Sequence, residues 1–149
     1  MFNKSFKDIA GADIQKLITS GASEGNNLEF KRKPWENGDD EVREMLRDVS
    51  SMANAFGGYL LLGMDEEDGT GKAKEIIGVS DAENYRDRFL ASCMANLQPR
   101  IIGLDIKSIE CEGAKKVILI KVPDSLNLHQ VTSKGYTNFG EGTIGRRVE

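Results

Sequence analysis

The sequence predicts an α+β fold, in which helices pack against a mixed β-sheet. A short apolar run at 59–62, entered through two glycines, is typical of a strand that is buried on both faces. The segment before it, 39–56, has apolar residues at helical spacing. Two later segments, 101–110 and 115–122, are typical of strands joined by a tight turn.

The N-terminal half predicts two helices that flank a strand. Apolar residues at helical spacing predict a short amphipathic helix at 12–20. Apolar and charged residues alternate at 28–33, which predicts a strand with one apolar face. The clearest helix begins at Asp39 or Asp40 and ends at Phe56, and its apolar stripe consists of Val42, Met45, Leu46, Val49, Met52, Ala53 and Phe56.

The middle of the chain predicts a hairpin and a second long helix. A central strand at 58–64 follows the first long helix directly, and 75–78 is expected to return as its hairpin partner. Ser80 and Glu83 have the spacing of a capping box, so we expect Ser80 to be the N-cap of a helix that ends near Leu97. With strands 101–110 and 115–122, these elements predict a mixed sheet of about five or six strands. Two main helices and the short N-terminal helix cover it.

The size and composition are those of one domain. A chain of 149 residues can bury a core without disulfides or metals. We therefore expect a single domain over 1–149, with a core from about 12 to 145, either stand-alone or excised from a longer protein. No apolar run approaches the roughly 18 residues of a membrane span, and the N-terminus lacks an apolar signal core. We expect a cytoplasmic protein without membrane partners.

Cysteine and histidine are too scarce for a metal site of their own. Cys93 and Cys111 have no Cys-x-x-Cys spacing, and the single histidine, His129, is more typical of a surface or packing residue. Any metal would therefore be a hard cation that carboxylates hold, namely Mg²⁺ or Mn²⁺.

Three acids are candidate metal ligands. Glu24 lies in a turn, Glu29 in the first strand and Asp65 at the end of the central strand. If these strands are neighbours, the acids converge and a cation there activates water against a phosphodiester. Lys31, on the same strand face as Glu29, would stabilise charge on the phosphate. In the alternative interpretation Glu24 is solvated, Glu29 pairs with Lys31 or a neighbouring strand, and Asp65 caps a turn.

Lys31, Arg32 and Lys33 form the densest basic run, and the net charge of −4 does not exclude a local basic face for nucleic acid. Further candidate contacts are Arg43, Arg47, Arg146 and Arg147, and the aromatic residues that could stack on bases are Trp35, Tyr136 and Phe139. The alternative is that a short basic run guards the end of an edge strand.

A glycine-rich segment, 69–72, ends in Gly71 and Lys72 but does not match a phosphate-binding loop. Glu66 stands where such a loop has its first glycine, and Ala73 replaces the hydroxyl residue after the lysine. No helix is expected after it, so a hairpin turn is the better interpretation. Nucleotide binding is the least favoured function.

The order of several motifs resembles the Schlafen-type Alba-like domain. They are Glu24-x4-Glu29-Phe30-Lys31, the helix end 52–58, the strand 59–63 with Asp65, and the later Val-Pro-Asp-Ser segment with His129. Members of this family are often labelled DNA-binding, and some were formerly grouped with ATP-binding proteins. The resemblance covers nearly the whole chain, from about 12 to 145.

The resemblance implies a site. In Schlafen proteins with ribonuclease activity three acids form the active site, and the matching residues here are Glu24, Glu29 and Asp65, with Lys31 beside them as a nucleic-acid contact. Because those ribonucleases join two such lobes into a clamp, the resemblance also implies that one lobe would act on structured RNA as a homodimer. The family commonly has Tyr-x-Arg-x-Gly near the end, whereas here Asn138 follows Tyr136 in place of the arginine. Arg146 or Arg147 are candidate substitutes.

Two functions follow from these observations. The first is a nucleic-acid-binding domain, for RNA before DNA, with a candidate divalent-metal-dependent endoribonuclease site. The alternative is a non-catalytic regulatory module that binds nucleic acid or a partner. Whether the chain is an enzyme stays open at the level of the sequence.

Overall fold

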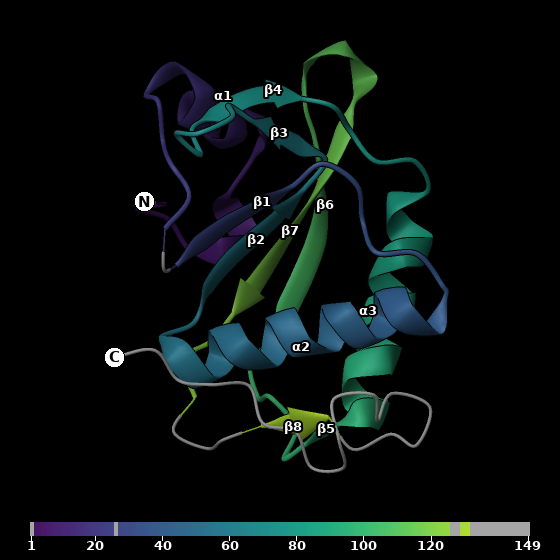
Figure 1. The fold of residues 1–149 in the computed structure, drawn as a ribbon. Helices are drawn as coiled ribbons and strands as arrows, with labels where there is room; N and C mark the ends of the chain where they lie inside the picture. Colours follow the sequence, from purple (N-terminus) through teal and green to yellow (C-terminus); the bar gives the residue numbers. More distant parts are fainter. Residues whose placement is uncertain (1, 26, 126–128, 132–149) are drawn as a thin grey trace.

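Three α-helices and eight strands make up the part of the chain that the computed structural model describes, residues 2–25, 27–125 and 129–131 (Figure 1). The helices are α1 (Gly11–Thr19), α2 (Asp39–Ala55) and α3 (Ala82–Asn96), with single 3₁₀ turns η1 (Phe6–Asp8) and η2 (Glu112–Ala114). The strands are β1 (Leu28–Lys31), β2 (Gly58–Leu62), β3 (Met64–Glu66), β4 (Ala73–Ile76), β5 (Leu97–Gln98), β6 (Asp105–Glu110), β7 (Lys116–Val122) and β8 (Gln130–Val131).

The main sheet is mixed, with strand order β1-β2-β7-β6. β1 runs parallel to β2, with Leu28 opposite Tyr59, and the other neighbours are antiparallel. The predicted α+β class is therefore confirmed, and the first strand lies beside the central one, which is the condition on which convergence of the predicted acids depended. Among the described residues the main sheet has four strands, and the others form two-stranded sheets, β3-β4 and β5-β8, in place of the single sheet of five or six strands that we expected.

Apolar side chains fill both faces of this sheet. Leu60 and Leu62 point to one face and join a core with α2 and α3, whereas Leu61 points to the other and joins a core with α1, β3 and β4. All three are nearly inaccessible to solvent, as the apolar run predicted. In Figure 1, α2 crosses one end of the strands, and α1 with the β3-β4 hairpin lies at the opposite end.

The predicted strand 58–64 is interrupted by Gly63, which separates β2 from β3. Gly63 has φ 93°, and a Cβ there would lie 2.9 Å from Cγ2 of Val79. Its N–H donates to the carbonyl of Lys31 at 2.7 Å, and its own carbonyl accepts from the N–H groups of Ile77 at 2.7 Å and Gly78 at 3.0 Å. The chain thus leaves the main sheet at this glycine and begins the β3-β4 hairpin.

Two predicted boundaries were wrong. Asp81, in the left-handed conformation with φ 56°, is the N-cap of α3, so Ser80 is not the cap. The strand predicted at 101–110 begins only at Asp105, because Ile101 and Leu104 pack against the α2-α3 core outside the sheet. The 69–72 segment is part of the β3-β4 hairpin connection, as expected.

His129 is a buried packing residue and only 1% of its surface is exposed. The side chain of Asn54 holds its backbone on both sides, donating to its carbonyl at 3.1 Å and accepting from its N–H at 2.9 Å. Its Nδ1 faces the carbonyl of Pro99, so Nδ1 carries a proton, and its Nε2 lies 2.6 Å from the Ser125 hydroxyl oxygen. Among the described helices none is long and apolar enough to cross a membrane.

Candidate acidic site

Glu24 is held against the outer edge of β1. Its carboxylate Oε2 accepts from the backbone N–H of Phe30 at 2.7 Å, which satisfies a donor that no neighbouring strand reaches. Its backbone N–H donates to Gly71 at 2.9 Å, and Ser23 forms a bridge with Lys72. Glu24 is therefore fixed between β1 and the β3-β4 hairpin.

Glu66, which the sequence interpretation did not single out, lies beside Glu24. A hydrogen bond between the two carboxyl groups, followed by desolvation and by the charges of Glu24, Asp65 and Asp68, raises the pKa of Glu66 to about 7. Its Oε2 atom is buried and has no hydrogen-bond donor among the described residues. Two ionised carboxylates cannot donate to each other, so the hydrogen bond between Glu24 and Glu66 requires a proton on one of the two groups.

The β3-β4 pairing explains how neighbouring acids reach one region. Asp65 pairs with Glu75, whereas Glu66 pairs with Ala73, so the register shifts between them. Such an irregularity increases the local twist and changes the direction of side chains. Both Asp65 and Glu66 are half-buried, as is expected where a hairpin leaves a packed sheet.

Glu29 and Lys31 lie on the face of β1 opposite Leu28 and Phe30, and Glu29 is close to acids of α2 on that face. Partial desolvation raises the pKa of Glu29, the charges of Asp48, Glu66 and Glu44 raise it further, and Lys31 lowers it. The residue is exposed by surface area, so the surrounding protein desolvates its carboxylate only in part. The charge of Lys31 thus partly balances this group of acids.

Asp48 of α2 is a second residue that sequence reasoning missed. Desolvation raises its pKa to about 6, with Glu44 adding to the effect and Lys31 and Arg47 opposing it. It lies on the polar side of the α2 pattern, where acids are common, so the pattern alone did not distinguish it from a solvated residue. For Glu66 a signal existed, namely its place in the acidic run 65–67 after the central strand.

Asp65 forms an ion pair with Arg32, at 3.0 Å between Oδ2 and Nη1. Glu66 is thus electrostatically coupled to each of the predicted acids, Glu24, Glu29 and Asp65. Within the described residues, however, no group of three or more His, Cys, Asp or Glu side chains has an arrangement that could hold a metal ion. The donor chemistry of these carboxylates suits Mg²⁺ or Mn²⁺, and their role as ligands stays a prediction.

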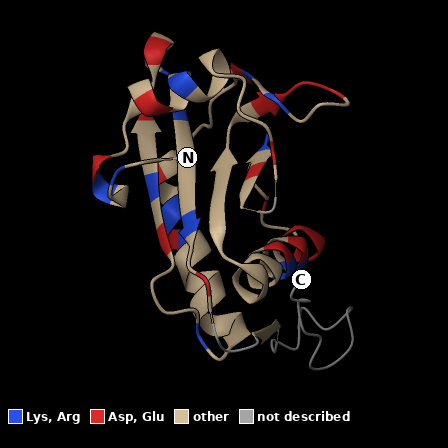
Figure 2. Ribbon diagram, turned by 90° about the vertical axis from the view of Figure 1, so that its left-hand side faces the viewer, with Lys and Arg blue, Asp and Glu red and all other residues tan. Residues whose placement is uncertain are grey.

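The basic run divides among different environments. The Lys31 ammonium lies 5.2 Å from the centre of the Trp35 ring, Arg32 pairs with Asp65, and Lys33 is exposed. Trp35 is only 2% exposed and belongs to the α2-α3 core, so the expectation that it could stack on bases was wrong. Acidic and basic segments are intermixed along the ribbon in Figure 2.

Several predicted contacts lie outside the described residues. These are Tyr136, Asn138, Phe139, Arg146 and Arg147. Of the other candidate arginines, Arg43 of α2 is 8% exposed and pairs with Asp40 at 2.6 Å, whereas Arg47 is exposed. Arg43 is thus poorly placed to extend the basic run.

The fold and the site define an α+β domain with coupled acids and a lysine at the edge of a mixed sheet. The chain belongs to the Schlafen, AlbA_2 family, whose model matches residues 24–147. The resemblance that the motifs indicated is thereby confirmed. A search among curated proteins finds no match.

Two solved structures share the fold. One is the solution NMR structure of the N-terminal domain of a protein from Nitrosomonas europaea described as related to the ATP-dependent DNA helicase RecG. It has a TM-score of 0.58 and 17% identity, over 95% of this chain and 90% of that one. The other is the crystal structure of the DIP2311 protein from Corynebacterium diphtheriae, with a TM-score of 0.53 and 21% identity over 92% of this chain. This chain spans 24% of the DIP2311 chain.

Proposed function

We propose that this protein is a nucleic-acid-binding domain that cleaves RNA with the help of a divalent cation. The observation that carries the proposal is the coupling of Glu66 to Glu24, Glu29 and Asp65, beside the cation of Lys31. Membership in the Schlafen, AlbA_2 family supports a nucleic-acid-related role, as does the fold shared with a domain of a DNA-helicase-related protein.

The proposed site uses the chain's residues in different roles. Glu24, Glu29 and Asp65 would hold Mg²⁺ or Mn²⁺, which supplies Lewis acidity and an activated water when bound. Lys31 would neutralise the phosphate, since its ammonium is held near the Trp35 ring and the acids. Arg32 and Lys33 would contact the backbone of the strand, and both are exposed.

A second function has support from one specific contact. The ion pair between Arg32 and Asp65 engages one predicted ligand, and the described acids do not form a three-ligand set. This arrangement favours a non-catalytic regulatory module, in which the acids are structural and the basic residues bind nucleic acid or a partner.

Cleavage assays separate the two functions. We would incubate labelled tRNA, single-stranded RNA and DNA with the protein, in Mn²⁺, in Mg²⁺ and in chelator, beside the variants Glu24→Gln, Glu29→Gln and Asp65→Asn. The matched control is Glu67→Gln, because Glu67 is an exposed acid on the same hairpin connection. Metal-dependent RNA cleavage that each site variant abolishes and the control retains is the expected result.

Binding without cleavage would leave only the regulatory module, provided that the three variants bind as the wild type does. Preference for RNA and action as a homodimer are further parts of the proposal. Light scattering with and without tRNA measures the oligomeric state, and a monomer in both conditions would contradict action as a homodimer.

A further inference from the structure

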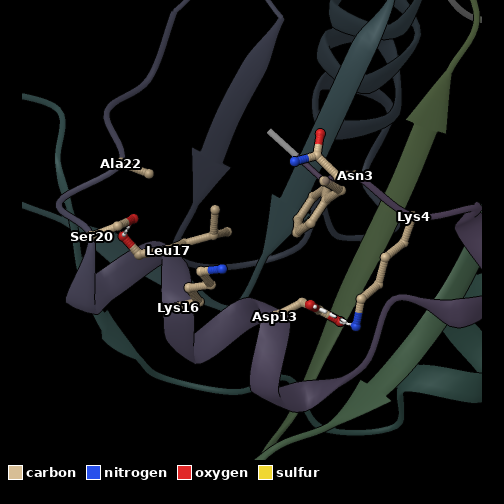
Figure 3. Close-up of a pocket in the computed structure, with 8 residues that line it drawn as sticks. Asn3, Lys4, Asp13, Lys16, Leu17, Ser20 and Ala22 are labelled. Carbon is tan, nitrogen blue, oxygen red and sulfur yellow. Dashed lines mark hydrogen bonds and ion pairs between the residues drawn. The ribbon is translucent and has the colours of Figure 1, made fainter.

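A cavity of about 290 Å³ lies between α1 and the N-terminal segment, away from the main acidic cluster (Figure 3). It is lined by Phe2, Asn3, Lys4, Asp13, Lys16, Leu17, Ser20 and Ala22. Every one of these residues precedes Glu24, where the match to the family model begins. The cavity is therefore built by a part of the chain that the family match does not cover.

Local contacts fix two of the cavity walls. The Phe2 ring packs edge-on against Tyr59 of β2, at 5.0 Å between ring centres and 83° between planes. Asp13 accepts from the backbone N–H of Ala10 at 2.9 Å and pairs with Lys4 at 3.1 Å, and these two contacts hold the pKa of Asp13 below its usual value. The site is thus largely formed before any ligand binds.

Three polar groups at the cavity remain available. Lys16 and the Asn3 amide make no side-chain hydrogen bond or ion pair with another described residue, and the Ser20 hydroxyl reaches only a distant carbonyl, that of Leu17 at 3.5 Å. Lys4 and Lys16 against Asp13 leave one net positive charge. In Figure 3 the Lys16 and Leu17 side chains extend from α1 toward the side where Asn3 lies.

We propose that this cavity binds one nucleotide unit, with the base against the apolar side chains and the phosphate at Lys16. An apolar floor with a few convergent polar groups is typical of ligand sites, and the Phe2 ring, which Tyr59 orients, offers the aromatic surface on which bases stack. One net positive charge suits a phosphodiester. The Asn3 amide and Ser20 hydroxyl supply both donors and acceptors for a base edge.

The position of the cavity connects it to the proposed function, on which this inference rests. Ala22 precedes Glu24 by only two residues, so their Cα atoms are at most about 7 Å apart. The carbonyl of Ala22 accepts from Ala73 at 2.8 Å, which ties this segment to the hairpin of Asp65 and Glu66. The wall of the cavity is therefore joined through the backbone to the segment that carries Glu24 and to the β3-β4 hairpin.

The test is an NMR titration of the full chain with adenosine and uridine 5′-monophosphates, beside inorganic phosphate and the free nucleosides. We expect amide shift changes at Leu17, Ser20 and Ala22 that are larger for the monophosphates than for phosphate or nucleoside.

Lys16→Ala should weaken affinity about fivefold, the effect of losing about 1 kcal/mol from an exposed charge contact. Lys7→Ala is the matched control, because Lys7 is an exposed lysine that does not line the cavity. Ser20→Phe, at an exposed position, should fill the opening and abolish the shifts while the remaining spectrum shows an intact fold.

Binding of a single-stranded RNA in parallel distinguishes the two proposals. If the monophosphates cause no shifts while RNA still binds, the cavity is not a nucleotide site and the proposed function stands. Equal affinity for inorganic phosphate and monophosphates also overturns the inference, because it indicates a simple anion site. If the monophosphates bind at the cavity but no RNA or DNA does, the inference holds for free nucleotides and the proposed function fails.

Discussion

The carboxyl groups of Glu24 and Glu66 interact across the gap between the edge of β1 and the β3-β4 hairpin, and this contact raises the pKa of Glu66 to about 7. Near neutral pH the folded protein therefore holds a proton that two solvated glutamates would have released. Folding brings these like charges together, and their repulsion lowers the free energy of unfolding when both are ionised.

A double-mutant cycle with Glu24→Gln and Glu66→Gln should show strong non-additivity at about pH 8. Each substitution removes the same repulsion, so each should raise the free energy of unfolding by about 1 kcal/mol, and the double variant should gain less than the sum. The measurement is urea unfolding in chelator. At about pH 5, where the pair holds its proton, the coupling should shrink, and additive effects at both pH values would contradict the contact.

Asp48→Asn should stabilise the protein above neutral pH. Folding raises the pKa of Asp48 from 3.8 to about 6, so the folded state binds the proton more tightly than the unfolded state does. Below about pH 4 Asp48 does not affect stability. As the pH rises from about 4 to about 6, the residue increasingly destabilises the folded state, and above about 6 this destabilisation is constant. We expect a gain of about 1 to 2 kcal/mol at about pH 8 and little at pH 4, measured by thermal unfolding. Asp87→Asn, at an exposed acid of α3, is the matched control.

Arg32→Gln should change stability little and nucleic-acid binding more. The guanidinium is 56% exposed on its side chain, and exposed ion pairs contribute about 0 to 1 kcal/mol. If Arg32 contacts phosphate, the salt dependence of single-stranded RNA binding should lose a slope of about 0.7. Lys121→Gln, at an exposed lysine of β7, is the matched control. Equal slopes for both variants would remove Arg32 from the interface.

Gly58→Ala should unfold the protein or destabilise it by more than about 2 kcal/mol. Gly58 has φ 144°, and a Cβ there would overlap the backbone of Asn27, which precedes β1. The overlap would separate the parallel strands that carry the site. Circular dichroism during heating measures the effect, and Gly25→Ala, where a Cβ meets nothing within 4 Å, should be close to neutral.

The fold class and the long elements could be predicted because their patterns depend on burial. The apolar stripe of α2 and the run at Tyr59 to Leu62 reflect which sides face the cores, and those sides are as expected except at Phe56, which follows α2 and is 52% exposed. The division at Gly63 was less accessible, because Met64 continues the apolar run and is itself buried in the second core. The small β5-β8 sheet was missed, since two-residue strands leave no periodicity to detect.

The candidate site was predictable in its residue types and less so in its contacts. Spacing placed Glu29 and Lys31 on one strand face, which the structure shows, but nothing local indicated that Asp65 pairs with Arg32 or that Glu66 faces Glu24. Those contacts depend on the register shift of the hairpin and on the segment before β1 that places Glu24 along the edge of this strand. Trp35 was a candidate for stacking on bases, whereas its packing against α2 and α3 buries it.

Gly63 connects the main sheet to the β3-β4 hairpin, and the acids of the candidate site lie on both. Its N–H donates to the carbonyl of Lys31 in the main sheet, and its carbonyl accepts from the N–H groups of Ile77 and Gly78, which follow β4. Gly63 is therefore bonded both to the main sheet and to the segment that leaves the hairpin. Glu29 and Lys31 belong to the main sheet and Asp65 and Glu66 to the hairpin, whereas Glu24 is bonded to both, through Phe30 and Gly71. The position of the Lys31 ammonium relative to Asp65 and Glu66 therefore depends in part on the backbone at Gly63, and a side chain at this residue would strain that connection.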